Sequence, residues 1–113
     1  MTDLSAEDAK LVTLARATRA RVGAPEGAAV RDGDGRTYAA ATVDLPSLQL
    51  SAVQACVAMA VASGTRALEA AVLLSEAEAV TEPDLGALRD LGGPGVVVHL
   101  GDTRGQVRGT STT

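Results

Sequence analysis

The spacing of apolar residues predicts a first helix near the start of the chain. Leu11, Leu14 and Val22 fall on one stripe at helical spacing, while most of the basic residues of this stretch face elsewhere. Gly23 supplies the flexible position at which such a helix ends. We therefore expect a helix over residues 6–22 with one side packed against the rest of the fold.

Short apolar runs and turn residues predict the strands. Residues 27–43 are expected to form a hairpin, because apolar runs flank the Asp-Gly-Asp-Gly turn at 32–35. Further strands are predicted at residues 68–75, at residues 96–100 and, as a short edge strand, around Val107. The last residues, 109–113, are expected to be a disordered tail.

Residues 50–62 predict a second helix of unusual composition. Apart from Ser51 and Gln54 this segment is apolar all the way round, and Pro46 and Ser47 break the chain before it. A helix that covers one face of a sheet normally keeps a polar outer stripe. The far side of this helix therefore needs a covering surface, which predicts contact with another subunit.

The order of the elements predicts the fold class. Pro83 begins a third, short helix, which Gly92 and Gly93 end. The order is then helix, strand, strand, helix, strand, helix, strand, strand. It predicts an α/β fold: a three-layer α/β/α sandwich with a mixed, mostly five-stranded sheet, in a single domain over residues 1–113.

Composition narrows the range of partners. The formal net charge of −4 and the scattered arginines argue against a phosphate-binding surface of the kind that nucleic-acid binding needs, and the single aromatic residue, Tyr38, leaves no stacking platform. No apolar run is long enough for a membrane span, and the first residues are acidic where a signal peptide is basic, so we expect a cytoplasmic protein without a membrane partner. The core must be built from Ala, Val and Leu, which bury less apolar area than aromatic rings.

Two segments resemble the active-site segments of the small, single-domain cytidine deaminases. They are TVDLPSLQLSAVQACVAMA at 42–60 and PDLGALRDL at 83–91. In that family the first carries Cys-Ala-Glu and the second Pro-Cys-Gly-Ala-Cys-Arg, whose three cysteines bind zinc while the glutamate moves protons. The resemblance runs from about residue 8 to 105 and includes small residues retained in order: Gly27, Ala28, Ala29, Gly86 and Ala87, with Arg89.

The functional positions of the family are apolar in this chain. Ungapped pairing of the segments places Val53 at the first zinc ligand, Leu85 and Leu88 at the paired cysteines, and Ala55 at the glutamate. None of these side chains can bind zinc or carry a proton, so we expect no catalytic residue at these positions, no metal site and no zinc cofactor. The resemblance implies that the ligand positions converge, which predicts a small dry cluster in which each side chain contributes about 1.5–3 kcal/mol.

The resemblance also indicates candidate ligand contacts. The family holds a ribose through the Asn and Glu of Asn-Val-Glu, and the counterparts here are Thr42 and Asp44. Both side chains can form a hydrogen bond with a hydroxyl group. The simpler interpretation is that they are polar side chains at the end of a strand and face solvent. The aromatic residue that the family packs beside the base is replaced by Ala24.

Other reactive side chains favour structural interpretations. His99 follows a valine run, where a hydrogen-bonded structural imidazole is more common than a catalyst, and Cys56 lies on the apolar helix as an inert buried thiol. The acids at 32–35 lack the later ligands of a calcium loop.

Three hypotheses about function remain open at this point. The leading one is a non-catalytic, cytidine deaminase-like protein that binds a nucleoside-like ligand or a protein partner and forms a homo-oligomer, with the tetramer favoured because the family resemblance implies it. The second is a divergent nucleoside deaminase or hydrolase that uses different residues. The third is a purely structural interaction subunit, which predicts that Thr42 and Asp44 line no cavity.

Overall fold

A computed structural model describes residues 4–113 as one α/β domain. Its helices are α1 (Ala6–Val22), α2 (Ala52–Ala62) and α3 (Glu82–Gly92). Its strands are β1 (Gly27–Asp32), β2 (Thr37–Ala41), β3 (Val43–Leu45), β4 (Leu48–Leu50), β5 (Leu68–Leu74), β6 (Val97–Gly101) and β7 (Val107–Thr112).

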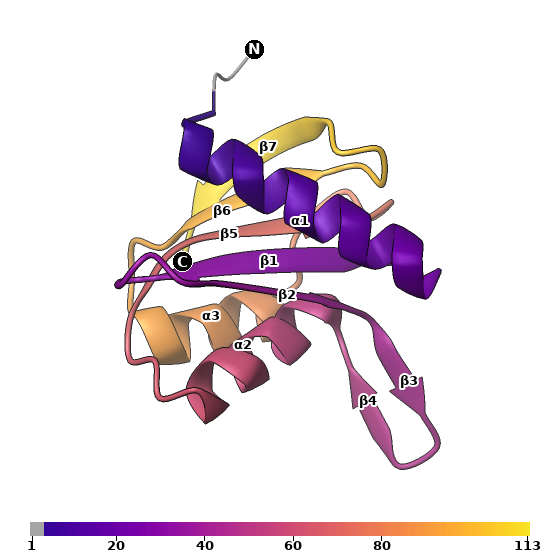
Figure 1. Cartoon of the computed structure of the whole chain (residues 1–113), viewed down its shortest axis with the longest axis horizontal. Helices are drawn as coiled ribbons and strands as arrows, with labels where there is room; N and C mark the ends of the chain where they lie inside the picture. Colours follow the sequence, from indigo (N-terminus) through magenta and orange to yellow (C-terminus); the bar gives the residue numbers. More distant parts are fainter. Residues whose placement is uncertain (1–3) are drawn as a thin grey trace.

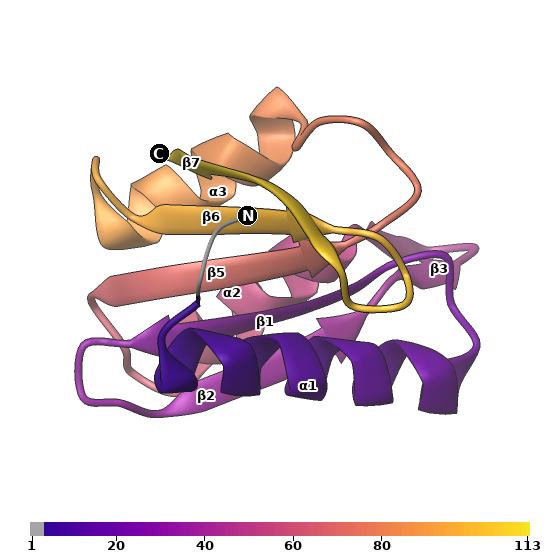
Figure 2. The ribbon, with the colours of Figure 1, turned by 90° about the horizontal axis from the view of Figure 1, so that it is seen from above.

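Five strands form one mixed sheet in the order β2-β1-β5-β6-β7. Only β5 and β6 are parallel, and α3 lies on the connection between them. Helix α1 covers one face of the sheet, and α2 and α3 cover the other (Figures 1 and 2). The predicted three-layer α/β fold with a mixed five-stranded sheet is therefore confirmed.

Helix α1 is fixed at both ends and along its inner face. The Ser5 side chain accepts a hydrogen bond from the backbone N–H of Asp8 at 3.1 Å, and Gly23 ends the helix at φ 73°. The helix lies so close to β1 that a Cβ on Gly27 would be 2.4 Å from the carbonyl oxygen of Ala15. Gly27 is thus required for the close approach of α1 to the sheet.

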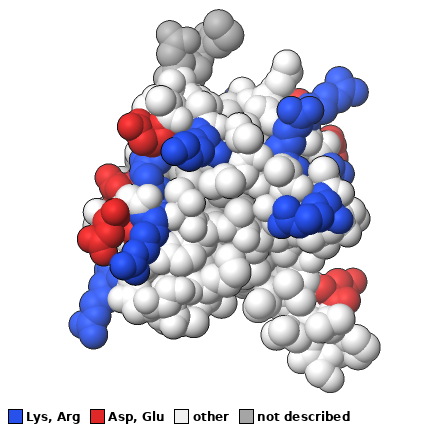
Figure 3. Space-filling model, viewed as in Figure 1, with Lys and Arg blue, Asp and Glu red and all other residues white. Residues whose placement is uncertain are grey.

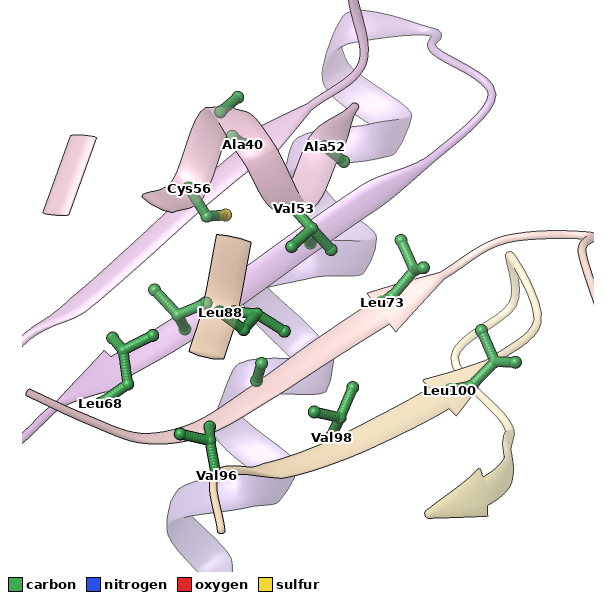
Figure 4. Close-up of a cluster of buried hydrophobic side chains, with 14 residues drawn as sticks. Ala40, Ala52, Val53, Cys56, Leu68, Leu73, Leu88, Val96, Val98 and Leu100 are labelled. Atoms are coloured by element: carbon green, nitrogen blue, oxygen red, sulfur yellow. The ribbon is translucent and has the colours of Figure 1, made fainter. Parts of the chain in front are cut away.

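Each face of the sheet has its own apolar core. The smaller core, under α1, consists of buried Leu11, Ala15, Ala29, Ala70, Val72 and Leu74. The larger one lies between the sheet and the two other helices and includes Val53, Cys56, Leu73, Leu88 and Val98 (Figure 4). The parallel pair β5–β6 contributes to both, as expected of strands buried on two faces.

Two features differ from the sequence-based predictions. Strands β3 and β4 form a separate two-stranded hairpin, in which Pro46 and Ser47 are the turn rather than a simple break. Residues 109–113 are not a disordered tail: β7 runs to Thr112 along β6, and the Thr113 N–H donates to the Val96 carbonyl at 3.0 Å. These residues are ordered because their backbone pairs with β6, although a composition rich in Gly, Ser and Thr does not predict a strand.

Candidate functional site

A groove of about 620 Å³ opens where α1 ends, the β3–β4 hairpin begins and α2 starts. It is lined by Val22, Ala24, Pro25, Glu26, Thr42, Val43, Asp44, Gln49, Leu50 and Ser51. This set brings the end of α1 and the residues after it together with both strands of the β3–β4 hairpin. The lining contains two carboxylates and no basic side chain.

Thr42 and Asp44 both line this groove. The Thr42 hydroxyl accepts a hydrogen bond from the Glu26 backbone N–H at 3.2 Å, which leaves the oxygen a further acceptor position. Asp44 is exposed and pairs across the hairpin with Gln49. The two residues named from the sequence therefore share one cavity rather than facing open solvent separately.

The walls of the groove are mainly aliphatic. Ala24 is 8% exposed and lines the groove beside Val22 and Pro25. Val43 and Leu50 face it from the hairpin. A flat apolar ligand would find contact area here but no ring to stack on.

A buried carboxylate lies next to the groove at the start of two helices. Ser51 caps α2, accepting from the Gln54 N–H at 3.0 Å, while the Gln54 side chain accepts from the Ser51 N–H. The Ser51 hydroxyl donates to Asp84 Oδ1 at 2.6 Å. Asp84 belongs to the first turn of α3 and is only 4% exposed, so this contact ties the N-terminal ends of α2 and α3 together. Asp84 could not be found from the sequence, because a single acid in a short helix forms no pattern.

The four apolar positions named from the sequence lie in and around one cluster. Val53 is 1% exposed, Leu88 is completely buried, and Ala55 is 7% exposed. Val53 and Leu88 point into the same cluster in Figure 4, and the half-buried Leu85 packs against it.

These side chains do not fit a zinc ion. Val and Leu have no lone pair to offer a metal. Within residues 4–113, moreover, no three or more His, Cys, Asp or Glu side chains gather closely enough to hold one.

His99 is hydrogen-bonded at both ring nitrogens. Nδ1 lies 2.8 Å from the Thr110 hydroxyl and Nε2 lies 2.8 Å from Asp8 Oδ2, and Arg31 pairs with the other Asp8 oxygen at 2.9 Å. Burial raises the pKa of Asp8, but the hydrogen bond with His99 and the ion pair with Arg31 outweigh it and lower the pKa below its ordinary value. This network joins α1 to the sheet, which is the structural role expected for His99.

The remaining candidate groups are also structural. Cys56 is fully buried, and burial raises the pKa of its thiol to about 12, so the reactive thiolate is suppressed. Asp32 organises the β1–β2 turn by accepting from the backbone N–H groups of Asp34 and Arg36, each at 2.9 Å. Burial raises the pKa of Asp32, but hydrogen bonds, first that from Thr65, outweigh this effect and lower it. The acidic residues at 32–35 therefore belong to the β1–β2 turn, which Asp32 stabilises through its hydrogen bonds.

In the described part of the chain, no helix is long and apolar enough to cross a membrane.

Comparisons with known proteins agree on one fold. Residues 4–105 match a family model described as cytidine deaminase-like. The cytidine deaminase from Burkholderia pseudomallei superposes with a TM-score of 0.80 at 23% identity, covering 96% of this chain and 93% of that chain. The cytidine deaminase from Mycobacterium leprae superposes with a TM-score of 0.74 at 23% identity, covering 96% of this chain and 94% of that chain. The cytidine deaminase from Bacillus anthracis superposes with a TM-score of 0.69 at 17% identity, covering 96% of this chain and 84% of that chain. No curated protein matches the chain. At these identities the solved structures establish a shared fold.

Proposed function

The chain belongs to the cytidine deaminase-like family, and on that premise we propose that it is a non-catalytic member that binds a nucleoside-like ligand in the groove lined by Thr42 and Asp44. The single observation that carries the proposal is the contrast between two neighbouring regions. The groove keeps polar groups in an open cavity, whereas Val53, Ala55 and Leu88 close the adjoining region with apolar side chains.

The size and chemistry of the groove support a small hydroxylated ligand. Its volume of about 620 Å³ falls within the range typical of small-molecule sites. Asp44 and the Thr42 oxygen can accept hydrogen bonds from sugar hydroxyl groups, and the aliphatic walls suit a flat ring. That both residues line a cavity favours a binding protein over a purely structural subunit.

The absence of zinc chemistry is tested on the purified protein. We expect no stoichiometric zinc by mass spectrometry of the metal content, and no ultraviolet change on incubation with cytidine or deoxycytidine. The physical reason is that Val53, Leu85 and Leu88 offer no donor atom and Ala55 cannot move a proton. Zinc at one ion per chain, or turnover, would overturn the non-catalytic assignment.

Ligand binding is tested by thermal shift with a panel of nucleosides. A ligand that binds only the folded protein raises its unfolding temperature. For whichever nucleoside gives the largest shift, we expect Thr42→Val and Asp44→Asn to reduce that shift. Asp34→Asn, which neutralises an exposed acid of the β1–β2 turn, is the matched control and should leave it unchanged. A panel without any shift would favour the purely structural subunit.

We also propose that the chain forms a homo-oligomer through the outer side of α2. This surface consists of Ala58, Met59, Val61 and Ala62, all exposed, with Val61 at 54%. No charged residue lies anywhere on α2, and the surface over α2 in the lower part of Figure 3 is white, with a red group on the neighbouring β3–β4 hairpin. Exposed apolar surface of this kind is typical of protein contacts.

Analytical ultracentrifugation tests the oligomer. We expect a mass above that of the monomer, with the tetramer favoured by the family resemblance, and dissociation in Val61→Glu. Ala79→Glu, which places the same charge on an exposed loop, is the control and should sediment like the wild type. A monomeric wild type would contradict the proposed assembly.

One observation favours a second candidate, a divergent hydrolase. The buried Asp84 carboxylate, 2.6 Å from the Ser51 hydroxyl beside the groove, is an acid next to a potential nucleophile. If turnover of any nucleoside is detected, this candidate predicts that Asp84→Asn abolishes it while the variant remains folded. Retained turnover in Asp84→Asn would exclude Asp84 from such chemistry.

A further inference from the structure

A second groove, on the other side of the molecule from α2, carries two arginines and no acid. It has a volume of about 400 Å³ and lies between α1 and the turn that connects β6 to β7. Its lining consists of Val12, Thr13, Arg16, Ala17, Ala20, Arg104 and Gly105. An acid-free arginine groove is unexpected in a chain with a formal net charge of −4.

The β6–β7 turn is held by hydrogen bonds within it, and it lies against α1. Asp102 Oδ1 accepts hydrogen bonds from the backbone N–H groups of Arg104 at 2.9 Å and Gln106 at 3.0 Å, and Gly105 N–H donates to the Asp102 carbonyl at 3.0 Å. Gly105 has φ 95°, and a Cβ there would lie 3.3 Å from Val12 and 3.4 Å from Arg16. Glycine therefore allows the turn to sit on the helix, which brings Arg104 beside Arg16.

This juxtaposition is not explained by ion pairs or by the helix dipole. Within residues 4–113 neither Arg16 nor Arg104 forms a salt bridge. The carboxylate of the same turn, Asp102, interacts with the charge of Arg104, but its Oδ1 accepts hydrogen bonds from backbone N–H groups. Arg19 and Arg21 lie in the last turn of α1, where their positive charges interact favourably with the helix dipole. Arg16 lies before this last turn, so the dipole does not explain its position. Figure 3 shows separate groups of blue side chains at the right, over the later turns of α1 and near the β6–β7 turn, with some red beside them.

We propose that this groove is a binding site for a small organic phosphate, separate from the groove of Thr42 and Asp44. Two guanidinium groups offer the paired N–H donors that phosphate oxygens accept, and the anion would relieve the repulsion between the two positive charges. Val12, Ala17 and Ala20 form a short apolar floor for the organic part of the ligand. The groove volume suits a small molecule.

The test is calorimetric titration of the full chain with phenyl phosphate and with inorganic phosphate. We expect phenyl phosphate to bind more tightly, because its ring covers the apolar floor. Arg16→Gln and Arg104→Gln should each weaken phenyl phosphate binding about tenfold, the loss typical of one charge-assisted hydrogen bond, and the double variant should show no saturable binding. Both side chains are exposed, so the variants are expected to fold.

The control is Arg66→Gln, which removes the same charge just before β5, at the opposite end of the sheet from the β6–β7 turn. It should leave the affinity unchanged. If Arg66→Gln weakened phenyl phosphate binding as much as Arg16→Gln and Arg104→Gln do, the anion would be attracted by the electrostatic field of the whole protein. That result would overturn the proposed site. Tighter binding of benzoate than of phenyl phosphate would overturn the choice of phosphate.

A second comparison separates this site from the proposed nucleoside groove. Thr42→Val with Asp44→Asn should leave phenyl phosphate affinity unchanged, whatever its effect on nucleosides. Loss of phenyl phosphate binding in that double variant would place the anion in the first groove and overturn the second site.

Discussion

Truncation of Leu88 tests whether packing holds the region in which the family resemblance implies a former zinc site. Leu88 is completely buried in the larger core, against which Leu85 packs. Leu88→Ala removes its buried methyl groups and leaves a cavity between α3 and the sheet. Substitutions of this kind cost about 2–5 kcal/mol, the sum of lost transfer energy and the cavity term. Since small domains are stable by only about 5–15 kcal/mol, this loss is a large fraction of the total free energy of unfolding.

The assay is urea unfolding followed by circular dichroism, with and without EDTA. A matched control is Leu45→Ala, the same chemical change at a side chain that is 54% exposed, for which we expect a change within about 0.5 kcal/mol. EDTA should not move the wild-type midpoint, because packing does not depend on a metal. The reasoning would be refuted by a Leu88→Ala variant as stable as Leu45→Ala, or by an EDTA-induced loss of stability in the wild type.

Three further predictions follow from single side chains. Gly27→Ala should destabilise the protein by about 1–3 kcal/mol in urea unfolding, because the added Cβ would collide with the backbone of α1. Gly86→Ala is the matched control on α3: its Cβ would enter open space, so the change should stabilise the protein by about 0.5–1 kcal/mol. The Cys56 thiol should react with Ellman's reagent only after unfolding, since it is buried and its pKa is raised to about 12; fast labelling of native protein would contradict this. The lowered pKa of Asp8 stabilises the fold above the ordinary carboxyl pKa of about 4, and this contribution is lost as the pH falls through the lowered value. Asp8→Asn should therefore destabilise the protein most at neutral pH and least in acid, as measured by unfolding across pH, and a loss independent of pH would disprove the assignment.

Long periodic segments were predictable from the sequence because burial on one side leaves a repeating pattern. Residues 6–22 were expected to be a helix, and α1 spans Ala6–Val22. The second helix was expected to begin near residue 50, but it begins at Ala52 because Leu48–Leu50 pair as β4. Local pattern alone could not reveal a competing partner strand.

The β3–β4 hairpin and most of β7 were not predictable for physical reasons. Strands of three residues are too short to show an alternating pattern. Strand β7 is mostly exposed and rich in Gly, Ser and Thr, and it is ordered by its backbone pairing with β6, which leaves no hydrophobic signal in the sequence. Sequence analysis identifies buried faces better than it identifies backbone ladders.

The candidate site was only partly predictable. Thr42 and Asp44 were named from the family resemblance, and the structure places both in one groove. The two arginines of the second groove come from α1 and from a turn 88 positions later, at Arg16 and Arg104, and only the folded chain brings them together. Contacts between such distant segments leave no local pattern.

The proposed loss of zinc requires another means of fixing the orientation of α2 and α3. A tetrahedral metal site is directional, because its ligands must point at one centre, whereas apolar packing fills space without specifying an angle. The Ser51–Asp84 hydrogen bond supplies that direction: it is short, it involves a carboxylate, and it joins the N-cap of α2 to the first turn of α3. Packing of Val53 and Leu88 then provides the free energy while Ser51 and Asp84 set the geometry, so the groove beside Thr42 can keep its shape without an ion.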